Sequence, residues 1–156
     1  MKAKEGVVEF LNQVLKAELT AVHQYLLHAA VCKNWGYGQL HEHFSHLSLD
    51  EVGHSSALID HILYLEGTPD VEHLDAVKRG RDVKVLFTHD RDFERDDVDL
   101  LRKAIAHGAK VGDFTTRHLL EEMVVDSEEH VDWFETQLRT IEQVGLDRYL
   151  SEQIKK

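Results

Sequence analysis

Apolar residues recur every three or four positions over four long segments of the chain, which is the spacing of amphipathic helices. The segments cover about residues 5–34, 39–66, 82–107 and 113–144, and a shorter one over 146–154 follows them. A single proline and nine glycines leave few interruptions in 156 residues. The pattern predicts an all-α fold, an antiparallel four-helix bundle with a short fifth C-terminal helix.

The stretches between these segments differ in length. The first two segments meet at residues 35–38, where two glycines supply the backbone freedom that a tight turn needs. Residues 67–81 show no sustained periodicity and are long for a connection in a compact domain. We therefore expect them to cross over along the length of the bundle. Gly108 and Gly112 are expected to bracket the last long turn.

Charged residues interrupt the apolar stripes at positions that should face inward. The second segment carries Glu51 and His54 between Leu47 and Leu58. A lone buried carboxylate is costly unless it is paired, neutralised or bound to a cation. Glu-x-x-His at i, i+3 directs both groups to one side of a helix, as a metal site inside a bundle requires.

Both halves of the chain repeat one spacing of these polar residues. The step from Glu18 to Glu51 is 33 residues, and so is the step from Glu94 to Ser127. A predicted turn falls midway within each pair, so the two residues of a pair should lie at one height in the bundle. A histidine comes three residues after Glu51 and three residues after Ser127. Carboxylates with imidazoles suit Fe, Mn or Zn, and two such halves indicate two metals. The predicted ligands are Glu18, Glu51, His54, Glu94 and His130.

One expected ligand is missing from this set. Di-iron carboxylate bundles use a Glu from each of two helices and Glu-x-x-His from the other two. Here Ser127 stands where the second motif requires a glutamate, and the adjacent Glu128 and Glu129 are rotated about 100° per residue around the helix. The alternative is a metal-free polar core neutralised by histidines and hydrogen bonds, but three carboxylates against two imidazoles balance poorly in it.

Charge and cysteine content narrow the range of partners. The formal net charge is -11, from 29 acidic and 18 basic residues, which argues against a nucleic-acid or anionic-membrane partner. Cys32 is the only cysteine, so an internal disulfide and a thiolate metal cluster are excluded. No run reaches a membrane-spanning length, and the first residues do not resemble a signal peptide. We expect a cytoplasmic protein.

Longer stretches of the sequence resemble the bacterioferritins, the bacterial branch of the ferritin family. The stretches that carry the resemblance include Gln24-Tyr25-Leu26-Leu27-His28-Ala29, Lys33-Asn34-Trp35-Gly36, Leu63-Tyr64-Leu65-Glu66-Gly67-Thr68-Pro69 and Glu129-His130-Val131-Asp132-Trp133. The resemblance implies a single ferritin-like domain over residues 1–156. It further implies a hollow shell of 24 copies built from dimers, which oxidises Fe(II) at an intrasubunit di-iron centre and stores the ferric mineral.

The resemblance also assigns roles to the predicted ligands. Glu51 would bridge the two irons, and Ser127 stands where a second bridging carboxylate is expected. The terminal ligands would be Glu18 with His54 on one iron and Glu94 with His130 on the other. The missing bridge leads us to expect a ferroxidase that is weakened, or one that fills the gap with water or an exogenous anion.

Further positions match the family outside the ligand set. Tyr25 would lie beside the centre and supply an electron during oxidation, and His46 and Asp50 would hold iron on the inner face of the shell. The family binds haem through a methionine at the dimer interface. Val52 occupies that position and has no sulfur, so we expect no haem bound through the usual ligand.

The altered positions leave two other functions open. One is a structural or storage subunit that co-assembles with a separate ferroxidase-competent or haem-binding bacterioferritin chain, because Val52 and Ser127 both depart from the family. The other is a di-metal oxygenase or peroxide reductase on the same bundle, which would not need the terminal helix. For release of stored iron, the resemblance implies an electron donor of the ferredoxin type.

Overall fold

The computed structural model describes residues 1–154, and helices account for most of them. The helices are α1 (Val7–Asn34), α2 (Gly38–Tyr64), α3 (Val83–Val111), α4 (Phe114–Val144) and α5 (Leu146–Ser151). The described residues contain no β-strand. The predicted all-α class, with four long helices and a short fifth, is confirmed.

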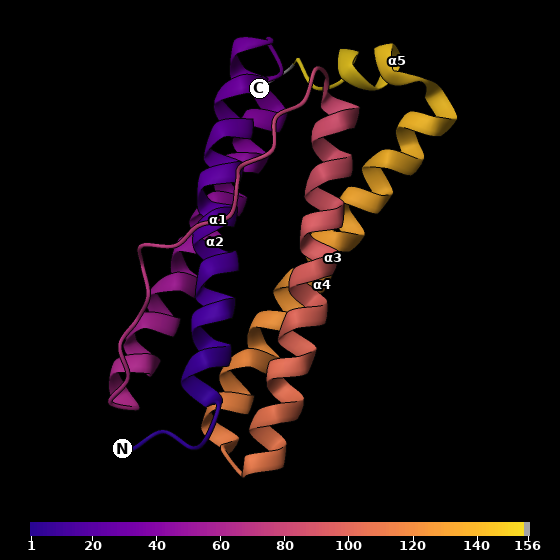
Figure 1. Cartoon of the computed structure of the whole chain (residues 1–156). Coiled ribbons are helices and arrows are strands. Elements are labelled where there is room, and N and C mark those ends of the chain that lie inside the picture. Colours follow the sequence, from indigo (N-terminus) through magenta and orange to yellow (C-terminus); the bar gives the residue numbers. More distant parts are fainter. Residues whose placement is uncertain (155–156) are drawn as a thin grey trace.

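The four long helices form two antiparallel pairs that pack side by side (Figure 1). One pair is α1 with α2, the other is α3 with α4, and α5 lies across one end of the bundle. The connection from α2 to α3 runs the length of the bundle, so α2 and α3 point the same way (Figure 1). The crossover predicted for residues 67–81 is therefore confirmed.

Hydrogen bonds hold this crossover against α1 at three heights. The Asn12 carboxamide oxygen accepts from the amide of Asp70 at 2.9 Å, near the start of α1. Further along, the Thr20 hydroxyl accepts from the amide of Asp75 at 3.0 Å. Further still, the Gln24 carboxamide oxygen accepts a hydrogen bond from the amide of Lys78 at 3.2 Å. The connection thus follows α1 past the middle of the bundle.

Local residue chemistry sets the ends of α3 and α4. Asp82 caps α3 by accepting a hydrogen bond from the amide of Val85 at 2.9 Å, and Asp113 does the same for α4. Gly112 ends α3 in the left-handed region, at φ 74°, which glycine adopts without a steric penalty. The prediction that α3 ends near residue 107 was wrong, because Gly108 lies inside the helix.

A polar layer divides the apolar core of the bundle into two clusters. The cluster at the α5 end includes Tyr25, Phe44, Phe87, Phe134 and Tyr149. The cluster at the opposite end includes Val7, Leu11, Leu58, Leu101 and Leu120. The residues between them along each helix are the charged ones that interrupt the stripes, and they are buried too.

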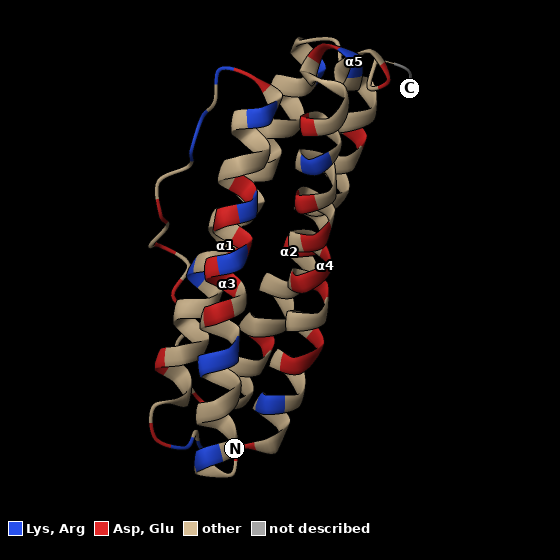
Figure 2. Cartoon of the chain, turned by 90° about the vertical axis from the view of Figure 1, so that its right-hand side faces the viewer, with Lys and Arg blue, Asp and Glu red and all other residues tan. Residues whose placement is uncertain are grey.

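Charged side chains cover the outside of the bundle. Figure 2 shows acidic residues recurring along its helices, with lysine and arginine between them. Ion pairs link α3 to α4 on this surface, Arg95 with Glu135 at 2.8 Å and Arg102 with Glu128 at 2.9 Å. Among the described helices, none is long and apolar enough to cross a membrane.

His43 is a largely enclosed imidazole that the fold keeps neutral. Its ring stacks on Trp133 with centroids 3.6 Å apart, and its Nε2 has no hydrogen-bond partner within the described residues. Burial, together with the smaller effect of the positive charges of His130 and His46, lowers the pKa of His43 to about 4.

Replacing His43 should make the metal-free protein less sensitive to acid. The unfolded chain takes up this proton near pH 6.5 and the folded chain only near pH 4, so His43 costs stability as the pH falls between those values. In His43→Phe, which keeps an aromatic ring on Trp133, the loss of unfolding free energy between pH 7 and pH 4 should be smaller by about 2 kcal/mol. Urea unfolding at several pH values measures this, and parallel curves for both proteins would contradict it.

Candidate metal centre

Glu51 lies at the middle of the polar layer and faces both candidate histidines. Its side chain is 1% exposed and projects from α2. Glu51 Oε1 lies 3.3 Å from His130 Nδ1, and Glu51 Oε2 lies 3.6 Å from His54 Nδ1. One carboxylate thus connects the two halves of the chain.

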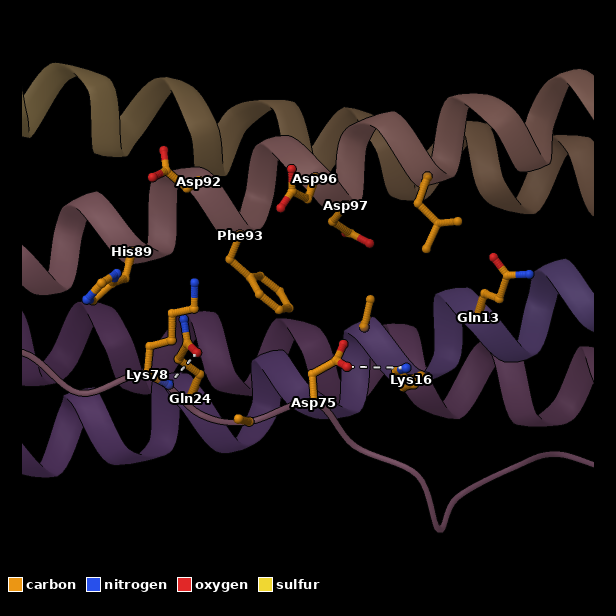
Figure 3. Close-up of a pocket in the computed structure, with 13 residues that line it drawn as sticks. Gln13, Lys16, Gln24, Asp75, Lys78, His89, Asp92, Phe93, Asp96 and Asp97 are labelled. Carbon is orange, nitrogen blue, oxygen red and sulfur yellow. Dashed lines mark hydrogen bonds and ion pairs between the residues drawn. The ribbon is translucent and has the colours of Figure 1, made fainter.

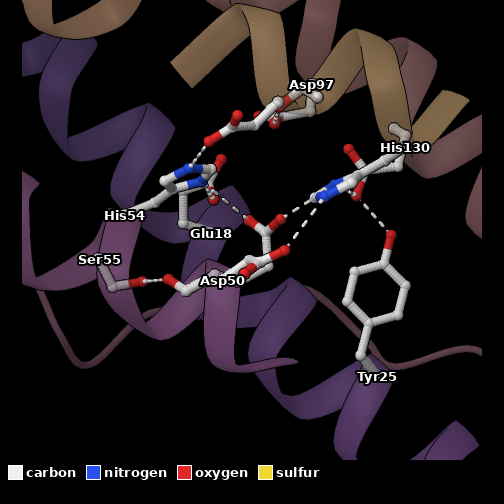
Figure 4. Close-up of polar contacts among 11 residues, drawn as sticks. Glu18, Tyr25, Asp50, His54, Ser55, Asp97 and His130 are labelled. Carbon is white, nitrogen blue, oxygen red and sulfur yellow. Dashed lines mark hydrogen bonds and ion pairs between the residues drawn. The ribbon is translucent and has the colours of Figure 1, made fainter. Parts of the chain in front are cut away.

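A second carboxylate flanks each histidine. His54 Nδ1 lies 3.1 Å from Glu18 Oε2, a contact between α2 and α1. His130 Nδ1 lies 3.2 Å from Glu94 Oε1, a contact between α4 and α3. The equal spacing in the two halves predicted this convergence from four helices, and the side chains meet in the interior of the bundle (Figure 4).

The outer nitrogen of each histidine meets an aspartate. His54 Nε2 lies 2.8 Å from Asp126 Oδ2, and His130 Nε2 lies 3.7 Å from Asp50 Oδ2. Metal-binding histidines commonly direct their second ring nitrogen to a carboxylate, which orients the ring and makes it more basic. Both rings therefore present Nδ1 to the centre in the manner of a ligand.

The donor set fits two cations that share one carboxylate. Glu18, Glu51 and His54 each offer one atom within 4.8 Å of the others, and so do Glu51, Glu94 and His130. Glu18 Oε1 and Glu51 Oε1 are buried without a hydrogen-bond partner in the described part of the chain. Buried acceptors without partners are costly, and a bound cation satisfies them.

The crowding of buried carboxylates shifts the pKa values of this layer. Burial, followed by the charges of neighbouring carboxylates, raises the pKa of Glu18 well above its usual range. Burial raises the pKa of Glu94 to about 7, although its hydrogen bond to His130 opposes the shift. Burial lowers the pKa of the histidines, but the contact with Glu51 outweighs it and raises the pKa of His54 to about 9.

Tyr25 lies beside the second donor group, which contains Glu51, Glu94 and His130. Its hydroxyl donates a hydrogen bond to Glu94 Oε1. Its ring belongs to the aromatic cluster at the α5 end of the bundle and lies 6.0 Å from the ring of Phe44. Burial and the charge of Glu94 raise the pKa of Tyr25 well above 10, so the phenol stays protonated at neutral pH.

Ser127 faces inward, and its two acidic neighbours do not. Ser127 is fully buried, whereas Glu128 and Glu129 are exposed, as the rotation around the helix predicts. The Ser127 hydroxyl donates a hydrogen bond to Asp97 Oδ2 at 3.2 Å. Asp97 is itself 4% exposed, and the sequence analysis did not single it out.

The remaining predicted residues lie around the centre. His46 and Asp50 are both exposed on α2, and Asp50 also reaches the outer nitrogen of His130. Val52 is 47% exposed and lines a shallow surface cavity together with Leu19 and Ile59. These three predicted residues are thus available to meet a ligand or another subunit.

A cavity of about 410 Å³ opens between α1, α3 and the crossover (Figure 3). Four aspartates contribute to its wall: Asp75, Asp92, Asp96 and Asp97. Lys16 pairs with Asp75 at 3.2 Å on the same wall. Because Asp97 also accepts the hydrogen bond from Ser127, this cavity borders the polar layer.

Comparison with known proteins places this geometry in a family. The family model of the ferritin-like domain matches residues 8–144. A bacterial ferritin of Synechocystis is 37% identical over 155 residues, covering 99% of both chains. A bacterioferritin of Streptomyces coelicolor is 39% identical over 151 residues, covering 97% of this chain and 90% of that protein. A bacterioferritin of Rhodobacter capsulatus is 35% identical over 145 residues.

The chain belongs to the bacterioferritins. The resemblance found in the sequence is confirmed over nearly the full length, including the terminal helix. Membership of the bacterioferritin family accounts for a long crossover and for buried carboxylates and histidines that meet at one height from four helices. It leaves Ser127 and Asp97 to be explained from the chain itself.

Proposed function

We propose that this chain is an iron-storage subunit that binds Fe(II) at the buried polar layer and oxidises it. The proposal rests on one observation above all: two groups of buried carboxylate and imidazole donors share Glu51. Glu18 and His54 would hold one iron, Glu94 and His130 the other, and Glu51 both. The names of the relatives support iron storage, and they support assembly into a shell, which we propose has 24 subunits.

The substrate of this reaction is Fe(II), and the co-substrate is dioxygen or hydrogen peroxide. Two Fe(II) ions each lose one electron, and dioxygen takes up both with two protons to give hydrogen peroxide. The carboxylates offset the higher charge of the ferric product, which favours oxidation. Asp126, which contacts His54 Nε2 at 2.8 Å, would orient that imidazole so that its Nδ1 can bind Fe(II), and Asp50 lies 3.7 Å from the corresponding nitrogen of His130.

Tyr25 is placed to act as an auxiliary electron donor. Its hydroxyl already donates to Glu94, so loss of an electron from the ring can be accompanied by transfer of the proton to that carboxylate. His46 and Asp50, exposed on the inner face of the proposed shell, would receive iron outside the centre. Val52 offers no sulfur, and we propose a shell without haem held by the usual methionine.

Stopped-flow mixing with Fe(II) tests the proposed activity. The assembled protein in aerated buffer should oxidise the first two Fe(II) per chain well above the rate of protein-free buffer, and larger additions should give ferric mineral that stays with the protein. The absorbance of ferric iron and its co-elution with protein in size exclusion measure the two steps. An oxidation rate equal to that of buffer would end the ferroxidase proposal, and iron that elutes away from the protein would end the storage proposal.

A further inference from the structure

Asp97 is a fourth carboxylate in the polar layer, one turn beyond Glu94 on α3. Asp97 is buried, with only 4% of its surface exposed. Oδ2 accepts the hydrogen bond from Ser127 at 3.2 Å, while Oδ1 has no partner among the described residues. A buried carboxylate with one orphaned oxygen is costly unless something else binds it.

Asp97 lies close enough to the candidate centre for its charge to act there. The negative charge of Asp97 acts on Glu18, the predicted ligand on α1, and the negative charge of Glu51 acts on Asp97. Three buried oxygens therefore lack partners in one small region: Glu18 Oε1, Glu51 Oε1 and Asp97 Oδ1.

Counting Asp97 restores the ligand composition that Ser127 reduces. Di-iron bundles of this type place four carboxylates and two histidines at the centre. Glu18, Glu51 and Glu94 supply three carboxylates, and Asp97 supplies the fourth from α3 instead of α4. The Ser127 hydroxyl lies at hydrogen-bonding distance from Asp97, so a glutamate at 127 would project into the space that Asp97 occupies.

We propose that Asp97 is the sixth protein ligand of the metal pair, in place of the carboxylate that is absent at position 127. This inference rests on the proposed function, because it concerns the same centre. Asp97 stands outside the two compact donor groups, so its carboxylate must turn from Ser127 toward the cations by rotation of its side chain. Asp97 also lines the cavity between α1, α3 and the crossover, whereas Glu18 is not among the residues of its wall (Figure 3).

Titration of the assembled, metal-free protein with Co²⁺ tests the assignment without any redox step. Visible absorption and equilibrium dialysis should count two Co²⁺ per chain in the wild type. In Asp97→Asn, which retains a group for the Ser127 hydrogen bond, at least one Co²⁺ should bind about 10- to 100-fold more weakly. Asp99→Asn removes an equal charge from an exposed position two residues away and should leave both affinities unchanged.

Two further measurements separate loss of a ligand from damage to the fold. Metal-free Asp97→Asn should unfold at a temperature no lower than the wild type, because it loses a buried charge that had no full complement of partners. Combining Ser127→Glu with Asp97→Ala, which vacates the space beside position 127, should restore the lost Co²⁺ affinity, because it moves the fourth carboxylate back to α4.

Each outcome bears on a different part of the proposal. Equal Co²⁺ affinities in the wild type and Asp97→Asn overturn the role of Asp97 and leave the proposed function standing. A wild-type protein that binds no Co²⁺ at the centre overturns both. Weaker binding that Ser127→Glu fails to restore, together with a lowered unfolding temperature, assigns Asp97 to the fold and also overturns its role as a ligand.

Discussion

Glu51→Gln should lower the initial rate of Fe(II) oxidation at least 100-fold, to about the rate of protein-free buffer. Glu51 is the one carboxylate that faces both histidines, so its loss weakens both metal positions at once. An uncharged amide is a poor ligand for iron, and it donates where the two imidazoles also require an acceptor. Stopped-flow absorbance at two Fe(II) per chain measures the effect.

Glu129→Gln is the matched control for this prediction. Glu129 carries the same charge on the exposed face of α4, next to His130 in the sequence, and its replacement should leave the rate within about twofold. A Glu51→Gln protein that oxidises Fe(II) at the wild-type rate would show that the shared carboxylate is not part of the reaction. Oxidation would then have to be sought outside the polar layer.

The sequence predicted the position of the centre because helix geometry fixes it. Glu18 and Glu51 are equidistant from a turn, and residues related in that way must lie level in an antiparallel pair. Asp97 escaped the same reasoning because the repeated spacing directs attention to position 127 on α4. Its only signal was a gap in the stripe of α3, three residues beyond Glu94 and four before Leu101.

Phe44→Ala should destabilise the metal-free protein by about 3–5 kcal/mol. Phe44 is fully buried on α2 at the centre of the aromatic cluster, and its ring lies 5.6 Å from that of His28 and 6.0 Å from that of Phe87. Aromatic rings from α1, α3 and α4 pack around Phe44. Truncation to alanine therefore leaves a cavity that these helices cannot fill by moving together. The free energy of unfolding in urea, followed by circular dichroism, measures the loss.

Phe114→Ala separates the effect of burial from the effect of removing an aromatic ring. Phe114 begins α4 with its side chain 64% exposed, so the same truncation there should change the free energy of unfolding by less than about 0.5 kcal/mol. If both variants lost equal stability, the aromatic cluster would contribute no more than the surface does. The bundle would then be held chiefly by the cluster at the opposite end.

The ends of the helices were less predictable than the stripes, and Gly108 explains why. A glycine near the end of a periodic segment favours a helix terminus, yet Gly108 is helical. A Cβ at this position would lie 3.3 Å from the carbonyl oxygen of Asp113, because the start of α4 passes close to it. A glycine is thus required at position 108 because two helices approach closely there. A single sequence does not distinguish such a glycine from one that ends a helix.

Asp97 also bears on whether this chain needs a competent partner chain. The hypothesis of a purely structural subunit depended on Val52 and on a centre that lacks one carboxylate. With Asp97 buried against Ser127, four carboxylates already reach the polar layer. If Asp97 compensates for Ser127, Val52 is the one departure left without compensation, and it concerns the proposed dimer surface and not the oxidation of iron.

The division of the apolar core has a consequence for how the bundle moves. Apolar clusters pack the helices together at either end, while the middle buries several carboxyl groups whose like charges oppose one another. Opening fluctuations that leave both ends intact should therefore concentrate at the height of Glu51 and Glu94. Cations that bridge these carboxylates reverse the repulsion, so arrival of the substrate itself would lock the region that had to open to admit it.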